Sequence, residues 1–543
     1  MRKNIITLAL FTIFIIILYF PIFNNFFQQD EWSAFANIYI VGYREYILNA
    51  LIPDPGHYVP FARILLAVYF KMFQLDYWKW ALVSVIWHIS NSFLVYVLAR
   101  KIFKENWQAF SSGILFALFA AGQQATSWVV ADGATHGATF FILLSIILFF
   151  ESKIWLSLLM LLFSLLFKEI AVGIFAFFPL LIIVKNYLEK KKIFDIRILY
   201  FIVVAIFYVG FRYLTFLGIF SNITAPIITE SQTANDITYN IATFPIKGIS
   251  QIIIPQYILL ETSKFIAIKL PDGIAGLPGT NFFDNFYLKY VFESLVYFVF
   301  VIISIIMILL LKFKRNKMVT IATFGLIFAA INSMIYALSP GRSSFIPIID
   351  SRNLYLPSIG IIFFIVGIAS LFKNWKLSYI FILIFTIFNF VVTKIELTKI
   401  SNIGSQRQNI LNQITQDNLL LKDKQIFYIE SDTSYYGLPD EIRILPFQSG
   451  FGQTLLVWFS NQSDFPKDLY KDQFLWDLKS QGYKEVGNRG FGYFRELNLL
   501  KSTLSEYNLS IESVVAYSWD SKEEKLTNIT EAIRSKLKGD KKR

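Results

Sequence analysis

Two adjacent carboxylates, Asp30 and Glu31, follow closely after the first apolar segment of the chain. That segment, residues 4–23, is long enough for a helix that rises ~1.5 Å per residue to cross ~30 Å of hydrocarbon. A carboxylate can take a proton from an attacking hydroxyl group, and two of them also suit Mg²⁺ or Mn²⁺. The pair predicts catalysis at a membrane surface, with Asp30 as general base and Glu31 orienting it or the acceptor. A divalent cation at the pair stays open, and an ordinary solvated loop pair is the alternative.

Three basic side chains beside apolar segments could bind a phosphate group: Arg342, Arg352 and Lys168. Arginine grips phosphate through two parallel hydrogen bonds and stays charged at all physiological pH values. We predict Arg352 and Arg342 as the main phosphate ligands, followed by Lys168. Anchoring to lipid headgroups is the alternative for the arginines, and a structural turn is the alternative for Lys168.

Four further residues are assigned to the substrate pocket: His57 and Arg63 in the first outer loop, and Glu169 and Tyr355 at the starts of two spans. Charged groups next to membrane spans are costly to place and therefore often functional.

Three polar side chains lie within apolar segments. His88 and Asn91 are one turn apart on the same face of a predicted helix, which favours hydrogen bonds between helices. His136, together with Asp132, stands at the start of another such helix and is interpreted as a cap residue.

Composition defines the class of protein. Of 543 residues, 55% are hydrophobic and only 16% are charged, whereas soluble proteins have roughly 25% charged residues. The absence of cysteine excludes disulfides, thiolate metal sites and a cysteine nucleophile. The net charge of +12 is attributed to short loops between spans rather than to nucleic-acid binding, because no basic helix or stacking module accompanies it.

Apolar runs predict a polytopic α-helical membrane protein with about eleven spans. They lie near residues 4–23, 78–99, 109–126, 133–150, 154–167, 169–185, 198–218, 288–311, 318–338, 353–372 and 377–396. With the N-terminus in the cytoplasm, the strong basic clusters all fall on the inner side, as the positive-inside rule requires. These clusters are residues 100–104, 185–197, 312–317 and 373–376. The N-terminal segment is interpreted as a retained signal anchor, since bulky residues follow it in place of a cleavage site.

The predicted outer side receives a first loop, residues 24–77, a second long loop, residues 219–287, and the tail. In the first loop, residues 61–75 have the pattern of an amphipathic helix lying in the membrane interface. The domains are therefore predicted as a membrane module, 1–399, and a small soluble α/β domain, 400–543. Within the tail, residues 425–429 and 454–459 are predicted strands, and residues 528–538 form a helical pattern.

The order of four motifs adds a resemblance. They are the acidic pair after the first span, His88-Ile89-Ser90-Asn91, Phe167-Lys168-Glu169, and Arg352-Asn353-Leu354-Tyr355-Leu356-Pro357-Ser358. In this order, over residues 1–400, they resemble the GT-C class of polytopic glycosyltransferases, which includes the protein O-mannosyltransferases and the aminoarabinose lipid A transferases. The likeness is nearest to the transmembrane O-mannosyltransferases with TPR repeats, but the tail of this chain shows no such repeat.

The resemblance implies inverting transfer of a sugar from a polyprenyl-phosphate donor to a glycan, lipid or protein acceptor at the outer, non-cytoplasmic face. No nucleotide is needed, and no Gly-rich phosphate loop is present. Two positions depart from the family pattern: Val59 precedes Pro60 where arginine is usual, and residues 120–124 lack the usual His-Pro and glutamate. The sugar and the acceptor stay open. A transporter or flippase for a lipid-linked glycan is the first alternative, and a non-catalytic membrane scaffold is the second.

Overall fold

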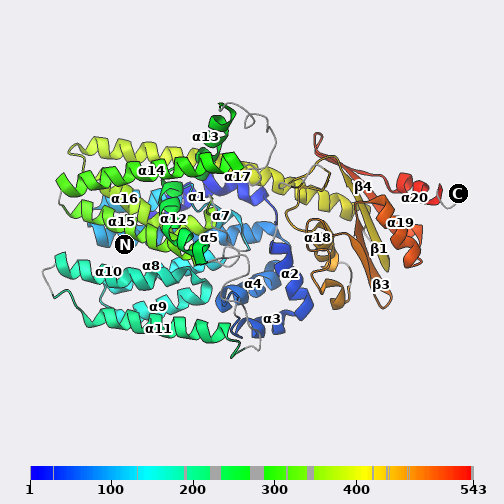
Figure 1. Ribbon diagram of the computed structural model, residues 1–543, viewed down its shortest axis with the longest axis horizontal. Coiled ribbons are helices and arrows are strands. Elements are labelled where there is room, and N and C mark those ends of the chain that lie inside the picture. The colour runs from blue at the N-terminus through cyan, green and yellow to red at the C-terminus, as the bar shows by residue number, and fades with distance from the viewer. Residues whose placement is uncertain are drawn as a thin grey trace. The chain divides into compact units, whose positions relative to one another are not determined.

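The computed structural model describes residues 2–28, 30–54, 56–130, 133–188, 192–220, 234–269, 286–313, 316–338, 348–418, 421–435, 441–461 and 465–539, together with Leu438 and Ser463. Up to residue 418 these residues are almost entirely helical (Figure 1). The helices are α1 (Arg2–Tyr19), α2 (Asp30–Val41), α3 (Tyr43–Ala50), α4 (Pro60–Phe73), α5 (Tyr77–Phe103), α6 (Asn106–Ala117), α7 (Gln124–Ser127), α8 (Gly133–Phe150), α9 (Ile154–Phe167), α10 (Val172–Leu188), α11 (Ile196–Phe216), α12 (Ala234–Ile253), α13 (Gln256–Lys269), α14 (Phe286–Phe313), α15 (Lys317–Met334), α16 (Tyr355–Ala369) and α17 (Trp375–Asp417).

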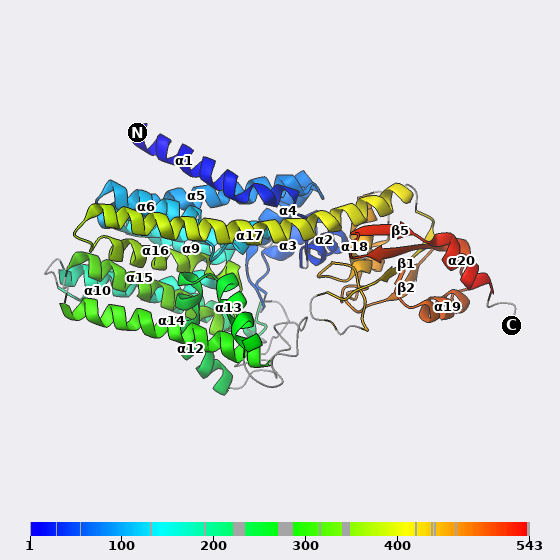
Figure 2. The same ribbon diagram turned by 90° about the horizontal axis from the view of Figure 1, so that it is seen from above.

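The chain forms two compact units. The first comprises residues 1–21, 48–66 and 79–397, and the second comprises residues 22–47, 67–78 and 398–543. The predicted boundary at 399/400 lies close to the last of these divisions, but the second unit also includes parts of the first loop. The helix α17 is continuous across 43 residues and passes the boundary without a break (Figure 2).

The protein is a multi-pass membrane protein. Within the described residues, eight helices are long and apolar enough to cross a bilayer, and two shorter apolar helices occupy residues 154–167 and 169–184. The eight correspond to α1, α5, α8, α11, α14, α15, α16 and α17. Long apolar helices of this kind satisfy every backbone hydrogen bond internally, which the hydrocarbon requires. The predicted helical membrane class is confirmed, and the interfacial pattern at 61–75 forms α4.

The predicted span 109–126 is wrong, because its helix ends at Ala117 and a short helix, α7, begins only at Gln124. Gly122 lies in the gap with φ +91°, and a Cβ there would meet the backbone of Tyr355 at 2.7 Å. Only glycine fits this turn without strain. The backbone N–H groups freed by the break are satisfied by distant side chains: Ala120 donates to Asn389 Oδ1 at 3.2 Å and Gly122 donates to Ser351 Oγ at 3.1 Å.

Most of the described residues of the predicted loop 219–287 form two helices, α12 and α13. α12 packs against α14 and α15 within the first unit. Its Lys247 is fully buried and pairs with Glu293 of α14 at 2.7 Å. A paired charge of this kind is tolerated where either charge alone would cost several kcal/mol. Lys247, in a segment predicted to be a loop, is thus a partner inside the bundle.

The closest helix contact joins α15 and α16. A Cβ at Gly325 would collide with the backbone oxygen of Gly360, and a Cβ at Gly360 would collide with that of Gly325. Small residues at such a crossing let two backbones touch and raise the packing attraction between helices. α16 is among the most buried of the spans.

The second unit contains a sheet of five strands in the order β2-β3-β1-β4-β5. The strands are β1 (Lys424–Ser431), β2 (Gly482–Val486), β3 (Arg489–Phe494), β4 (Val514–Asp520) and β5 (Lys525–Asn528). β1 is parallel to β3 and β4, while β2 and β5 run antiparallel at the edges. Figure 1 shows α19 (Leu497–Glu506) and α20 (Thr530–Gly539) beside this sheet.

The sheet has helices on both faces. Successive side chains of a strand point to opposite faces, so each face has apolar side chains to cover. Ile426 and Tyr428 of β1 pack with Leu500 of α19 and Ile533 of α20, whereas Phe427 points the other way and stacks on Phe459 at 5.8 Å. The small α/β domain is therefore confirmed, with the strand at 425–429 and the helix near 528–538. The strand predicted at 454–459 is wrong, because residues 451–458 form the helix α18 (Phe451–Trp458).

Candidate functional site

Arg352 lies in a short 3₁₀-helix (Ser351–Leu354) that leads into α16. This 3₁₀-helix contacts α7, which follows the break in the bundle. Its guanidinium carbon is 4.1 Å from the ring centroid of Trp128, a distance at which cation and aromatic face attract each other. Asp350 Oδ2 lies 3.9 Å from Arg352 Nη2, which makes a loose ion pair. The Arg352 side chain is 25% exposed. The backbone N–H of Arg352 donates to Gln124 Oε1 at 3.4 Å. The arginine is thus oriented by an aromatic ring and is still open to solvent.

Trp128 follows α7 directly and is buried. Its indole Nε1 has no hydrogen-bond partner among the described residues. An unsatisfied buried donor is costly and calls for an acceptor from water or a ligand. The ring and the guanidinium together offer a planar cation next to an unused N–H, which suits a phosphate or a sugar hydroxyl.

Tyr355, predicted to line the substrate pocket, is buried and holds a hydrogen-bond network. His88 Nε2 lies 3.1 Å from the carbonyl oxygen of Ala117, which can only accept, so this nitrogen carries the proton. Nδ1 of His88 then accepts from the Tyr355 hydroxyl at 2.8 Å. Because Ala117 ends α6, His88 satisfies one of the carbonyls that the break leaves without a partner in the helix.

Asn91 and His136 complete this network. Asn91 Nδ2 donates to the carbonyl oxygen of His136 at 3.2 Å and to the Tyr355 hydroxyl at 3.4 Å. The interpretation of His88 and Asn91 as partners between helices is confirmed. The cap role of His136 is wrong, because its ring is buried inside α8 and lies 3.4 Å from Thr126 Oγ1; Asp132 lies outside the described residues.

We predict that Tyr355→Phe destabilises the protein by about 1–3 kcal/mol, because it leaves His88 Nδ1 buried without a donor. Thermal unfolding in detergent, compared with the wild type, measures this. Tyr58→Phe is the matched control, since that hydroxyl belongs to an exposed loop and makes only a 3.5 Å contact with the Leu51 carbonyl. Equal melting temperatures for wild type and Tyr355→Phe would contradict the prediction.

Lys168 and Glu169 separate α9 from α10, and each has a partner. Lys168 Nζ donates to Thr135 Oγ1 at 2.7 Å. Glu169 Oε1 lies 3.4 Å from His57 Nδ1. Because Thr135 precedes His136 on α8, Lys168 belongs to the same part of the first unit as the Tyr355 network.

The loop that carries His57 is fastened by two arginines. Arg63 pairs with Asp54 at 3.1 Å. Arg212 of α11 donates to the carbonyl oxygens of Asp54 and Gly56, both at 2.9 Å. Arg212 was not among the predicted site residues, although an arginine inside an apolar span is a signal for a partner. Predicted pocket residues His57, Arg63 and Glu169 therefore meet in one polar cluster of the first unit.

The pKa of His57 lies above its ordinary value of about 6.5, chiefly because Glu169 accepts a hydrogen bond from the protonated ring. A pKa raised on folding gives stability that is complete below the ordinary value and disappears as the pH rises through the raised value. We expect His57→Gln to lower the melting temperature at about pH 6 and to leave it unchanged near pH 8.5. The effect is small, below about 0.5 kcal/mol, because His57 is exposed. An equal difference at both pH values in a paired melting series would contradict this.

The acidic pair belongs to the second unit, at the start of α2. Asp30 is exposed, whereas Glu31 is 1% exposed. Glu31 Oε2 accepts from the backbone N–H of Gln28 at 2.7 Å, and the N–H of Glu31 bonds back to the Gln28 carbonyl at 3.1 Å. The Glu31 side chain thus makes the carboxylate half of a capping box, and the backbone bond closes the turn that leads into the helix. Glu31 therefore orders the backbone around the exposed residue Asp30.

The same unit holds a buried arginine that the sequence analysis missed. Arg407, near the end of α17, is 2% exposed. Its Nε donates to the carbonyl oxygen of Pro446 at 2.6 Å, and its guanidinium reaches Gln28 Oε1 at 3.5 Å. Gln28 thus links Arg407 to Glu31, and these hydrogen bonds hold the backbone that carries the two carboxylates.

Two further predictions concern Arg342 and a divalent cation. Arg342 lies outside the described residues. Among the residues that are described, no group of three or more His, Asp and Glu side chains could hold a metal ion. Glu31 is engaged with backbone, so the pair does not offer two free carboxylates, and the divalent cation stays a prediction.

Comparisons with known proteins show a structural likeness. No protein-family model and no curated protein matches the sequence. Among solved structures, the chain is similar to the crystal structure of ArnT from Cupriavidus metallidurans bound to undecaprenyl phosphate, with a TM-score of 0.36 and 11% identity over 83% of this chain and 84% of that one.

Proposed function

We propose that the protein is a membrane glycosyltransferase that moves a sugar from a polyprenyl-phosphate donor to an acceptor at the outer face. The observation that carries the proposal is the setting of Arg352. Its guanidinium carbon lies over the Trp128 ring at 4.1 Å from the centroid, beside an indole N–H without a partner among the described residues and a break in the bundle. A planar cation held in this way at a membrane protein's polar break fits the phosphate of a lipid-linked sugar.

The reaction requires a nucleophile and a leaving group on opposite sides of the anomeric carbon. An acceptor hydroxyl attacks that carbon and forms the new C–O bond, while the bond from the carbon to the phosphate oxygen breaks. The sugar passes through an oxocarbenium-like transition state and its configuration inverts. The electron pair goes to the polyprenyl phosphate, whose extra charge Arg352 stabilises, and Lys168 adds positive charge on the same unit.

Asp30 is proposed as the base that takes the hydroxyl proton. Its exposure and its place on the helix held by Glu31 support this role. A positioned carboxylate typically contributes ~10²–10⁴-fold to such a step. Glu31 is proposed as a positioning residue, because its carboxylate is occupied by the Gln28 backbone.

A transporter for a lipid-linked glycan is the second candidate, and two observations favour it. The interrupted segment between α6 and α7 is the kind of discontinuous helix that transporters use. The buried pair Lys247–Glu293 lies near the start of the span 289–312, and charges within membrane spans often mark a transport path.

Reconstitution separates the two candidates. The purified protein is placed in liposomes that contain a polyprenyl-phosphate sugar labelled in the sugar, and an acceptor extract is added outside. Transfer predicts release of unlabelled polyprenyl phosphate and a labelled acceptor. Movement of intact donor between leaflets, with no product, would reject the transferase in favour of the transporter.

A further inference from the structure

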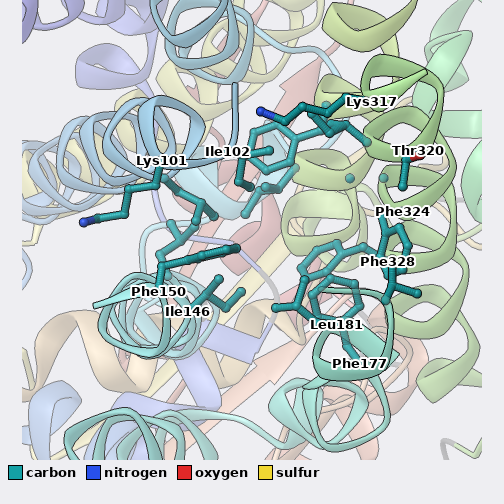
Figure 3. A pocket seen from close by; sticks show the side chains of 18 of the residues that line it. Lys101, Ile102, Ile146, Phe150, Phe177, Leu181, Lys317, Thr320, Phe324 and Phe328 are labelled. Carbon is teal, nitrogen blue, oxygen red and sulfur yellow. The ribbon is translucent and has the colours of Figure 1, made fainter. Parts of the chain in front are cut away.

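A cavity of about 440 Å³ lies in the first unit, where α5 and α8 end and α15 begins. Its wall is apolar almost throughout. Figure 3 shows Ile146 and Phe150 across the cavity from Phe324 and Phe328. The Arg352 site contributes none of its residues to this wall, so the cavity is a separate feature of the fold.

The depth of the cavity matches one leaflet of a bilayer. Along α15 its wall runs from Lys317 to Phe328, eleven residues apart, which at ~1.5 Å per residue is about 16 Å. The hydrocarbon core is ~30 Å thick, so this is about half of it. An acyl chain entering from the membrane surface would fill the cavity without crossing the midplane.

One end of the cavity is positively charged, and we take it as the entrance. Lys101, Lys104 and Lys317 all border the cavity. Lys101 is neutralised by Glu151, 2.9 Å away. Lys104 and Lys317 have no carboxylate partner within the described part of the chain, although the exposed Glu105 follows Lys104 in sequence. The entrance lies at the face with the basic clusters, which the positive-inside rule assigns to the cytoplasm.

We infer that this cavity binds a phospholipid of net negative charge from the cytoplasmic leaflet. Its acyl chain occupies the space between Phe150 and Phe324, and its phosphate lies between Lys104 and Lys317. The apolar wall excludes a polar metabolite, and the two lysines favour an anionic headgroup over a zwitterionic one. The inference does not depend on the transfer reaction, because it concerns binding alone.

Native mass spectrometry of the full-length protein tests this. The protein is released from nanodiscs that contain phosphatidylglycerol and phosphatidylcholine with identical acyl chains in equal amounts. We expect retained phosphatidylglycerol to exceed phosphatidylcholine by about tenfold or more, since each lysine near an anionic headgroup contributes roughly fivefold. Lys104→Ala/Lys317→Ala should bring the two lipids close to equal retention. Thr320→Trp, which fills the cavity and keeps both lysines, should lower the retention of both.

The matched control is Lys153→Ala/Lys376→Ala, which removes the same charge at the same predicted face but at residues that do not line the cavity. It should keep the wild-type preference. Equal retention of the two lipids by the wild type, or an equal loss in the control, would overturn the inference. Displacement of phosphatidylglycerol by an equimolar polyprenyl phosphate would also overturn it, because the occupant would then be the isoprenoid. The lysine variants change exposed positions, so a folding failure of Thr320→Trp leaves the test intact.

Discussion

Asp30→Asn is expected to lower the rate of sugar transfer by about 10²–10⁴-fold, the usual contribution of a positioned general base. Asparagine keeps the size and the helix-start position of the side chain but cannot accept the proton. Because Asp30 is exposed and Glu31 supplies the capping contact, the substitution should leave the fold unchanged. Initial rates with a labelled polyprenyl-phosphate sugar in membranes provide the measurement.

Two further variants serve as comparisons for Asp30→Asn. Asp423→Asn removes an exposed carboxylate of the same unit that pairs with Arg489 at 3.1 Å, and should keep the full rate. Glu31→Gln keeps an oxygen that can accept from Gln28, so it should lose much less than Asp30→Asn. Full activity of Asp30→Asn at normal expression would remove the carboxylate from the mechanism.

Arg352→Ala is expected to cost roughly 3 kcal/mol of transition-state stabilisation, about 10²-fold in kcat/KM, because charged hydrogen bonds to the phosphate are lost. Arg352→Lys should recover only part of this loss, since an ammonium group keeps the charge but not the planar fork or the stacking on Trp128. Steady-state kinetics over a range of donor concentrations measure both variants.

The matched control is Arg197→Lys, an arginine of the same unit that lies outside the predicted pocket and donates from Nε to Asp195 Oδ1 at 2.9 Å. It should leave the donor KM near the wild-type value. Trp128→Leu should move the donor KM in the same direction as Arg352→Lys, because the guanidinium loses its support. An unchanged kcat/KM for Arg352→Ala would show that the phosphate binds elsewhere.

Apolar length alone predicted most of the membrane helices. A run of about twenty apolar residues has few alternatives to a helix in hydrocarbon, because its backbone must bond to itself. The amphipathic pattern at 61–75 predicted α4 for a related reason, since its apolar stripe needs a surface. These signals are local, and they can be read without knowing what lies nearby.

The break after Ala117 could not be predicted from the sequence, because apolar residues continue through Ala121. What stabilises the break comes from far along the chain: His88, Ser351 and Asn389 satisfy its backbone groups. α12 was not predicted, because the Thr, Pro and Gly content of residues 219–287 indicated a loop and the pairing of Lys247 with Glu293 has no sequence signal.

In the candidate site, too, local signals could be predicted and contacts with distant residues could not. Arg352 was predicted from its charge beside a span and from its motif, but the ring that orients it, Trp128, has no sequence signal. Arg407 was missed because a basic residue in a polar part of α17 looks ordinary until its burial is known. Glu31 was predicted as an orienting group, and its capping contact with Gln28 is compatible with that role.

The touching glycines of α15 and α16 restrict where the bundle can move. With Gly325 against Gly360, neither backbone can slide past the other without opening a gap or a clash, since packed interiors have almost no spare volume. This contact also fixes the start of α16, Tyr355, relative to α15. The same holds for Arg352, three residues earlier. If a long isoprenoid enters and leaves during turnover, the parting of helices that admits it must occur at some other seam, with this pair as the stationary wall.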